Sequence, residues 1–534
     1  MKRKLLTALL CGALMLTSLA GCGQGAGNQS GTSADGESAV KDELVFVNYR
    51  DIRDLNPHLY AGEMYAQSIL YDTLVSNTSE GYVGCLAEDW TISEDGRTYT
   101  FNIRDGVTFS DGTPCDANAI LANFNAILEN RERHTWLEMM NLLVGVSAPD
   151  DDTFVIEMSE PYYPMLTELA CIRPFAMISP NCMIDGSTKD GVNGYIGTGP
   201  YVLTDFVTDE YAVFERNENY WGEKPAIRKI TVKVIPDNQT RIMALENGEI
   251  DLIFGKNMLD ADAISQYVDS DKFTVGLSDP TSTRHIVLNT THDILGDKSV
   301  RQALQHATNR QAISEGIFYG LEPAADTLYS TTVPYCDVDL EPYAYDADEA
   351  ARLLDEAGWT MGSDGVRAKD GQKLALDLLY NSDSVTEKTI SEYLQSEYLK
   401  LGISLNIHGE EEQSYRDNMK AGNFDMVFNI CWGMPYDPQS SLAAMRAPVY
   451  GDYAAQQGLE DKAEIDQAIT DILTSTDETK RQELYTFVLT RLHEDAVYIP
   501  LTFETNKALY TSDLKGVHFG TDQYDVDFAS MYFE

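Results

Sequence analysis

The sequence is poor in basic residues. Its 534 residues include 39 lysines and arginines against 85 aspartates and glutamates, so the formal net charge at pH 7 is -46. A chain of this charge is repelled by the phosphate backbone, and we therefore expect no nucleic-acid partner. The acidic residues are scattered along the chain, which is typical of a solvated surface and does not by itself indicate cation binding.

Common catalytic and metal-binding motifs are missing as well. The sequence has no G-x-S-x-G, H-E-x-x-H, G-x-x-x-x-G-K-[ST] or C-x-x-C, and its eight histidines form no H-x-x-x-H pair. We therefore expect no enzyme, although a surface hydrolase with a carboxylate pair stays as a remote alternative. The cysteines after the N-terminal segment are predicted to be buried thiols, but an exported chain could pair Cys171 with Cys182.

A single long apolar run occurs, at the N-terminus. Basic residues 2–4 precede the apolar residues 5–20, a run that is short for a membrane span and ends in small residues. This pattern indicates a cleaved signal. Leu-Ala-Gly-Cys at 19–22 has the form of a bacterial lipobox, which implies lipidation of Cys22. We expect residues 1–22 to be a lipoprotein signal and the Gly/Ser-rich residues 23–42 a flexible tether.

Strand and helix patterns alternate through the remaining chain of about 510 residues, which is long enough for two or three domains. Strands at 374–380, 403–407 and 424–430 are separated by helices at 387–401 and 411–420, an alternation that predicts a largely parallel α/β sheet. Further predictions are a helix at 64–74, two strands around a turn at 90–104, a helix at 116–128 and a final strand at 497–503.

Residues 425–453 predict a binding site. A strand that is apolar on both faces is followed by a loop with Trp432 and Tyr436. In open α/β sheets, ligands bind beyond the carboxyl ends of strands. We therefore expect a ligand at this loop.

Two further places have the chemistry of an anion site. Arg173 stands in an apolar segment, and its guanidinium needs either a ligand carboxylate or an internal Asp or Glu. Arg133 and Trp136 are three residues apart, so they share a face if this segment is helical. A cation beside an indole can hold a planar anionic complex, whereas the alternative is a solvated arginine and a core tryptophan.

The order of short motifs resembles that of the extracytoplasmic solute-binding proteins of peptide/nickel ABC importers. Each motif alone is weak, but together they span nearly the whole chain after the tether. They are WTISEDGRTYTFNIRDGVTFSDGTP (90–114), GTGPY (197–201), NENYWGEKPAI (217–227), RIMALENGEID (241–251), VRQALQHATNR (300–310) and YDADEAARLLDEAGW (345–359).

This resemblance implies a two-lobed periplasmic-binding-protein (Venus-flytrap) fold of the α/β class. The first lobe is expected at 43–282 with a β-rich subdomain at about 80–200, the second at 283–505, and a return to the first at 506–534. The ligand would bind between the lobes and close the hinge. The resemblance also implies a monomer that is lipid-anchored outside the cell membrane, or periplasmic, and that delivers its ligand to a permease and an ATPase.

Segments at 130–141, 172–175, 453–466 and 491–500 resemble the nickel-binding members more than the peptide-binding ones. This implies a nickel chelate as transported ligand, Ni²⁺ with histidine or a metallophore, and no permanent cofactor. Arg173 would bind carboxylates of the chelator. The other cleft residues that the resemblance implies are Arg133, Trp136, Trp432, Tyr436, Tyr60 and Met64.

One departure concerns the metal itself. Nickel-binding members usually place a metal-ligating histidine where this sequence has Tyr450, and a threonine where it has Tyr524. Either another side chain ligates the metal, or the metal arrives wrapped in its chelator, so no protein ligand is assigned. A di- or oligopeptide-binding protein is the main alternative, since Asp437 is available to hold a peptide amine. Haem, which some relatives bind, is a further alternative.

Overall fold

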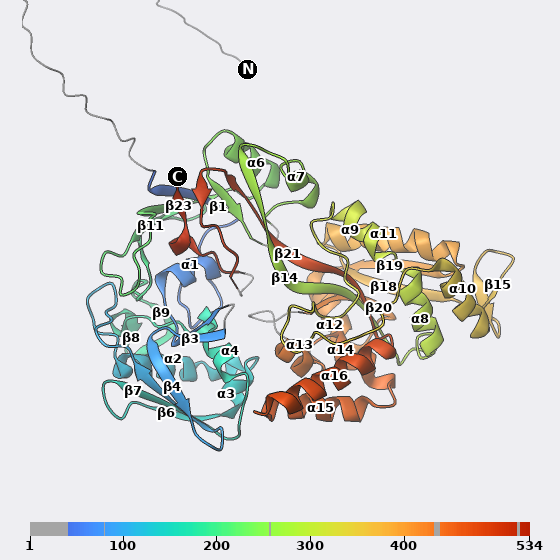
Figure 1. Cartoon of the computed structure of the whole chain (residues 1–534), viewed down its shortest axis with the longest axis horizontal. Helices are drawn as coiled ribbons and strands as arrows, with labels where there is room; N and C mark the ends of the chain where they lie inside the picture. Colours follow the sequence, from blue (N-terminus) through green and yellow to red (C-terminus); the bar gives the residue numbers. More distant parts are fainter. Residues whose placement is uncertain (1–40, 79–80, 256–257, 432–437, 521–523) are drawn as a thin grey trace, which may run out of the picture. The chain divides into compact units, whose positions relative to one another are not determined.

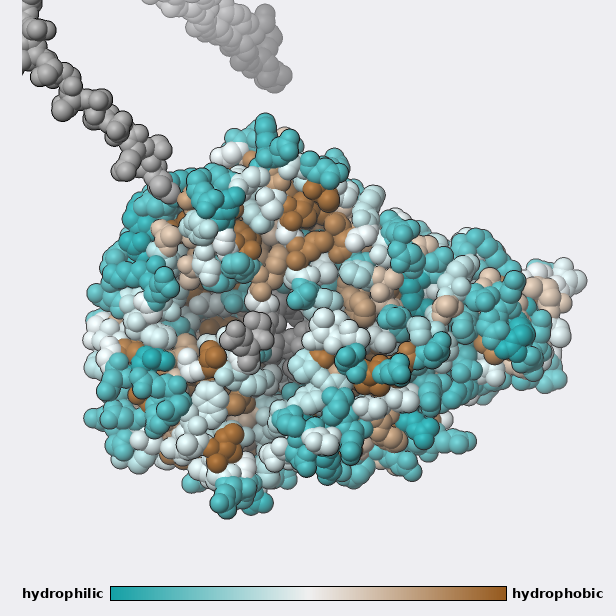
Figure 2. Space-filling view, in the orientation of Figure 1, coloured by the Kyte–Doolittle hydropathy of each residue, from teal (hydrophilic) through white to brown (hydrophobic). Residues whose placement is uncertain are grey.

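The structure is a computed structural model that describes residues 41–78, 81–255, 258–431, 438–520 and 524–534. It is a two-lobed α/β fold (Figure 1). The predicted signal, Cys22 and most of the predicted tether lie outside the described residues, as do Trp432, Tyr436 and Asp437. The face drawn in Figure 2 is mainly hydrophilic, with apolar residues in small patches. No helix within the described ranges is long and apolar enough to cross a membrane.

A ten-stranded sheet runs through both lobes. Its strand order is β10-β11-β12-β1-β13-β21-β14-β20-β18-β19. The bounds in that order are Tyr201–Val207, Tyr211–Arg216, Lys229–Val234, Glu43–Asn48, Leu252–Phe254, Tyr498–Thr511, Phe273–Leu288, Met426–Cys431, Ala375–Asn381 and Ser404–Glu410.

The two long central strands, β14 and β21, connect the lobes. They pair antiparallel from Phe273 opposite Thr511 to Val287 opposite Tyr498, with irregularities around Pro280. One end of β21 pairs with β13 of the first lobe, whereas one end of β14 pairs with β20 of the second lobe. Figure 1 shows both strands crossing between the lobes. The strand predicted at 497–503 therefore extends to Thr511, and two short strands follow it, β22 (Leu514–Lys515) and β23 (Tyr532–Phe533).

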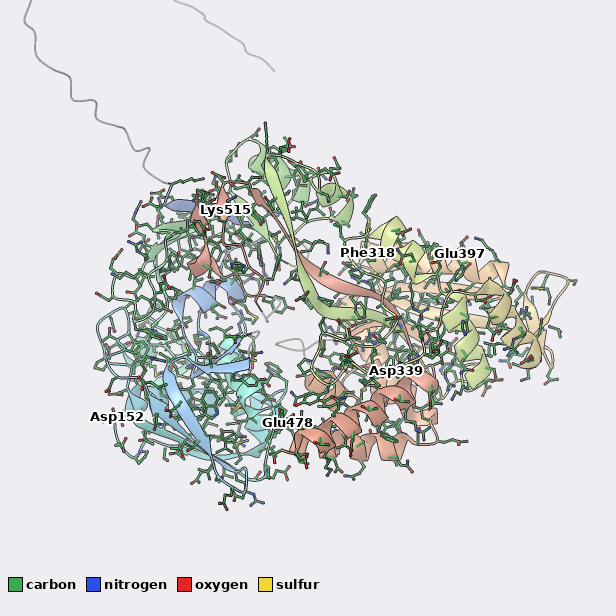
Figure 3. All side chains as sticks on the ribbon, in the orientation of Figure 1. Asp152, Phe318, Asp339, Glu397, Glu478 and Lys515 are labelled. Carbon is green, nitrogen blue, oxygen red and sulfur yellow. The ribbon has the colours of Figure 1, made fainter. Side chains whose placement is uncertain are left out.

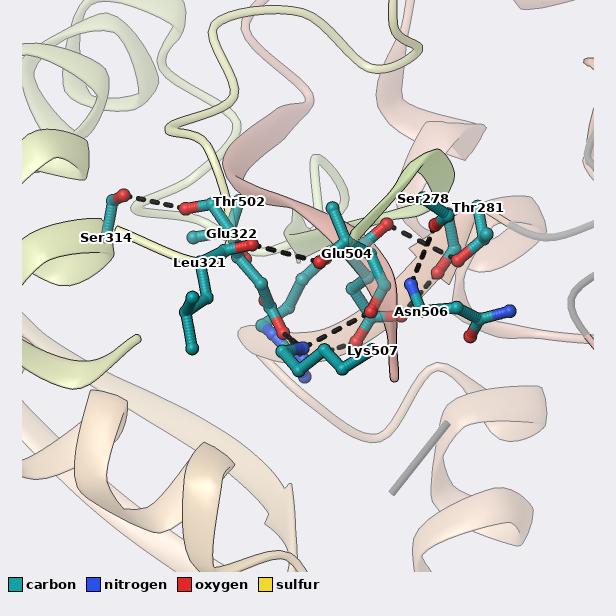
Figure 4. Close-up of polar contacts among 12 residues, drawn as sticks. Ser278, Thr281, Ser314, Leu321, Glu322, Thr502, Glu504, Asn506 and Lys507 are labelled. Atoms are coloured by element: carbon teal, nitrogen blue, oxygen red, sulfur yellow. Dashed lines mark hydrogen bonds and ion pairs between the residues drawn. The ribbon is translucent and has the colours of Figure 1, made fainter. Parts of the chain in front are cut away.

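Buried charges hold β14 to β21 near the middle of their length (Figure 4). Arg284 pairs with Glu504 and lies 3.7 Å from Glu322, which in turn accepts a hydrogen bond from Lys507 at 3.1 Å. Thr502 donates a further hydrogen bond to Glu322 at 3.0 Å. The two glutamates are buried and the two basic side chains are largely buried, so each charge is compensated by a partner.

The second lobe has a parallel sheet that is covered on both faces, as predicted. β18 pairs parallel with β19 and with β20. On β20, Met426 and Phe428 pack into a core with α8 (Lys298–Ala307) and α11 (Val385–Lys400), whereas Val427 packs on the opposite face with α15 (Lys462–Thr474) and α16 (Glu478–Glu494). The alternation of side chains along a strand supplies both cores.

The β-rich subdomain of the first lobe is a four-stranded antiparallel sheet. Its order is β4 (Ala87–Ile92), β5 (Thr98–Ile103), β7 (Thr153–Met158) and β6 (Leu143–Ser147). Helix α2 (Ala117–Glu129) packs on it, and Asp116 caps the helix by accepting a hydrogen bond from the amide of Ala119. The predicted strand pair and helix both occur here.

Helix α1 (Met64–Leu70) is shorter than predicted from the apolar pattern at 64–74. The Gly-Thr-Gly turn crosses its end, where Gly199 donates a hydrogen bond to the Leu70 carbonyl at 3.0 Å. A Cβ at Gly197 or Gly199 would overlap the backbone of Leu70. Tyr71 is therefore extended, and its side chain is buried in the core of the first lobe.

The subdomain also contacts the second lobe directly, through Tyr163. Its amide donates to the Leu473 carbonyl at 3.1 Å, and its hydroxyl donates to Glu478 Oε1 at 2.7 Å. Its ring stacks on the Arg481 guanidinium, 3.4 Å from the ring centroid. Glu478 lies at the start of α16, on the side of the first lobe (Figure 3). We call this the Tyr163 contact.

Candidate functional site

A cavity of about 840 Å³ is lined by residues of both lobes. This volume is in the range of small-molecule binding sites. The seven predicted residues that lie in the described ranges all line it: Tyr60, Met64, Arg133, Trp136, Arg173, Tyr450 and Tyr524. The structure thus brings these residues together from positions far apart in the sequence.

The first-lobe wall is built around Tyr60. Its hydroxyl accepts a hydrogen bond from Trp136 Nε1 at 2.7 Å and lies 2.6 Å from His134 Nδ1. Burial raises the pKa of Tyr60 to about 12, and burial, aided by the Arg133 cation, lowers the pKa of His134 to about 4. At neutral pH this wall therefore holds a neutral phenol and a neutral imidazole.

The prediction that Arg133 and Trp136 share a helix face is wrong. Arg133 lies in a 3-10 turn, Arg131–His134, and Trp136 lies in the bend that follows. The fully buried His134 anchors this turn, which brings both side chains to the cavity without a regular helix. The Arg133 guanidinium makes no hydrogen bond or ion pair with any described residue.

Arg173 lies at the base of the same wall and is 9% exposed. Its Nε donates to Gln67 Oε1 at 2.6 Å, and a terminal nitrogen donates to the Gly62 carbonyl. Both of these acceptors are uncharged oxygens. Such a cation has its greatest affinity for a carboxylate.

The second-lobe wall lies at the carboxyl ends of parallel strands, where the sequence predicts a site. Asn381 ends β18, and Phe428, Asn429 and Ile430 lie near the end of β20. Tyr450 precedes the short helix α14 (Gly451–Ala455). Burial raises the pKa of Tyr450, while the Arg416 cation acts in the opposite direction.

Sequence reasoning missed the charged residues that the second lobe adds to the cavity. These are Glu387 of α11 and Glu412, Arg416 and Lys420 of α12 (Glu412–Ala421). The spacing of four between the α12 residues places them on one helix face, but charged rows of this kind occur on most solvated helices. No sequence signal distinguishes a row that faces a cavity.

Metal-ligand chemistry is sparse in the described part of the chain. No group of three or more His, Cys, Asp or Glu side chains there is arranged to hold a metal ion. The six cysteines after the tether are buried and are not joined in disulfides, so Cys171 and Cys182 are not paired.

Comparison with known proteins identifies the fold and the family. The model of the bacterial extracellular solute-binding proteins, family 5 Middle, matches residues 81–452. The nickel-binding periplasmic protein of Escherichia coli (strain K12) is 41% identical over 499 residues, which cover 92% of this chain and 95% of that protein. The dipeptide-binding protein of the same organism is 26% identical over 506 residues, covering 89% and 91%.

A solved structure agrees with this assignment. The crystal structure of NikA from Brucella suis in complex with Fe(III)-EDTA has a TM-score of 0.89 and 43% sequence identity, and the match covers 92% of this chain and 100% of that one. The family model spans more than half of the sequence. The chain belongs to the bacterial extracellular solute-binding proteins, family 5.

Proposed function

We propose that this solute-binding protein captures a nickel chelate between its lobes for an ABC importer. The observation that carries the proposal is the charge of the cavity. Among the described lining residues, Arg133, Arg173, Arg416 and Lys420 are basic and only Glu387 and Glu412 are acidic, in a protein of net charge -46. Such a cavity repels a bare Ni²⁺ ion and attracts a complex with outward-facing carboxylates.

Each wall residue has a role in this proposal. Arg133 and Arg173 hold carboxylates of the chelator, while Trp136 and Tyr60 pack against its faces. The chelator saturates the metal, so that Tyr450 bounds the complex without ligating nickel. Two similar proteins support the choice of ligand. One is a nickel-binding periplasmic protein, and the other was solved in complex with Fe(III)-EDTA.

Delivery requires opening and closing about β14 and β21. The ligand stabilises the closed form because it contacts both lobes, and the closed form is then recognised by the permease. Lipidation at Cys22 would keep the protein at the outer face of the membrane, tethered by residues 23–42, and we propose that it acts as a monomer.

A dipeptide or oligopeptide is the second candidate, and one observation favours it. Glu387 and Glu412 line the cavity and would attract a peptide amine, while Arg133 or Arg173 would hold its carboxylate. The 26% identical dipeptide-binding protein supports the same reading.

Calorimetric titration separates the two candidates. The unlipidated, metal-stripped protein receives Ni²⁺ alone, Ni²⁺ with excess L-histidine, or a mixed dipeptide pool. We expect saturable heat with Ni–histidine and none with Ni²⁺ alone or with peptides. If dipeptides give saturable heat and neither nickel form does, the proposal is contradicted and the protein is a peptide-binding protein.

A further inference from the structure

Helix α12 presents a row of charged side chains to the cavity. Glu412, Arg416 and Lys420 stand four residues apart, so they lie on one face of the helix, and all three line the cavity. Arg416 Nε pairs with Glu412. The Lys420 ammonium makes no hydrogen bond or ion pair to any residue in the described ranges.

An unpaired lysine is out of keeping with the rest of the second lobe, where acidic residues abound. Lys298 pairs with Asp495, Lys462 with Asp466 and Lys480 with Asp471. Lys420 lies in the last turn of α12, where the helix dipole favours a cation. That effect accounts for a lysine at the helix end, but it does not account for a second cation, Arg416, one turn earlier on the same face.

The position of Arg416 connects this row to the rest of the site. Arg416 and Tyr450 both belong to the second-lobe lining of the cavity, and the Arg416 charge opposes the effect of burial on the pKa of Tyr450. Arg133 and Arg173 act in the same way on Tyr60 in the first-lobe wall. Both sides of the cavity are therefore lined by cations together with a tyrosine.

Resting on the proposed function, we infer that Arg416 and Lys420 form a second anion site, which binds a carboxylate that the chelate presents to the second lobe. The first-lobe arginines hold one side of the complex in the open form. The α12 cations engage the other side only when the lobes close, so their interaction energy contributes to closure. The site therefore favours chelates that present carboxylates on two faces.

The test compares two nickel complexes of different charge. Ni–EDTA is doubly negative, whereas Ni²⁺ with two L-histidines is neutral. We measure the affinity of each complex for wild type, R416M, K420M and the double variant by calorimetry. Loss of one charge-assisted hydrogen bond lowers affinity roughly tenfold or more, so the double variant is expected to bind Ni–EDTA at least tenfold more weakly. Its affinity for the neutral complex is expected to fall by a smaller factor, because that complex carries no net charge.

A matched control is available on α10 (Ala347–Glu356). Arg352 pairs with Glu349 and Glu356 on that helix, and its side chain is 51% exposed against 54% for Arg416, but it does not line the cavity. R352M is expected to bind both complexes as wild type does. E412Q is expected to raise the affinity for Ni–EDTA, which is the opposite of the effect of R416M. The reason is that E412Q removes the carboxylate that pairs with Arg416.

The outcomes separate this inference from the function on which it rests. If wild type binds the nickel chelates and the double variant binds Ni–EDTA with unchanged affinity, the α12 site is refuted but the proposed function is not. An equal loss for both complexes would refute it as well, because the site acts through ligand charge. Wild type that binds neither complex would overturn the proposed function itself.

Discussion

The Tyr163 contact gives a prediction about affinity from residues that do not line the cavity. Tyr163 belongs to the first lobe, and its partners Leu473, Glu478 and Arg481 belong to the second. In the proposed hinge motion, opening the lobes would separate these groups, so we expect the contact to stabilise the closed form only. A ligand that requires closure therefore binds more weakly when the contact is removed, whatever the chemistry of that ligand.

The magnitude follows from the contacts. The substitution Tyr163→Phe removes the hydrogen bond to the Glu478 carboxylate, and a bond to a charged group contributes about 1.5 to 3 kcal/mol. Tyr163→Ala also removes the ring from Arg481, which adds about 0.5 to 2 kcal/mol. A loss of about 2 kcal/mol in closure corresponds to a roughly 30-fold weaker affinity when the free protein is mainly open.

Calorimetry on Tyr163→Phe measures this loss, and small-angle scattering with saturating ligand checks that the variant still closes. Tyr267→Phe is the matched control, because Tyr267 donates to Glu246 at 2.8 Å within the first lobe. We expect the control to bind like wild type. An unchanged affinity for Tyr163→Phe, or a loss confined to one ligand, would show that the contact does not contribute to closure.

Three further predictions concern the site and its support. Arg173→Ala is expected to weaken nickel-chelate binding roughly tenfold to a hundredfold in calorimetry, and unchanged affinity would remove Arg173 from the site. Glu504→Gln leaves the largely buried Arg284 with less charge compensation, and denaturant titration is expected to show a loss of about 3 kcal/mol in unfolding free energy. Glu349→Gln, which removes a partner of the solvent-exposed Arg352, is the control and is expected to cost much less. Burial lowers the pKa of His58 to about 3, whereas its pKa in the unfolded chain is near 6.5. As the pH falls below about 6.5, the unfolded state therefore binds a proton before the folded state does, and the folded state loses stability. Melting temperatures of His58→Asn are expected to depend less on pH in that range, and parallel curves would contradict this.

The second-lobe sheet was predictable because apolar residues dominate it. β18 and β20 are short strands with mostly buried side chains, so local pattern predicts them. β19 buries only Leu405 within its span, and its prediction depends on the apolar residues at 403, 405 and 407. β21 was predicted only to 503, because Thr505, Asn506 and Lys507 carry no apolar signal. These polar residues are strand because they pair with β14, a partner more than two hundred residues away.

The site was predictable in a different way. Motif resemblance named the residues of the first-lobe wall, although the 3-10 turn that holds Arg133 has no periodic pattern. The α12 cations could not be found from sequence, since the same spacing occurs on exposed helices such as α10. Whether a charged row faces solvent or a cavity depends on how distant segments pack.

The central claim is that the cavity binds nickel inside a carboxylate-bearing chelator, without a protein ligand to the metal. Anomalous diffraction at the nickel edge, from crystals grown with Ni²⁺ and excess L-histidine, tests it most directly. We predict one nickel peak in the cavity, chelator carboxylates against Arg133 and Arg173, and no side-chain atom of the protein in the coordination shell. A cavity without nickel, or nickel coordinated by Tyr450 or another side chain, would contradict the account.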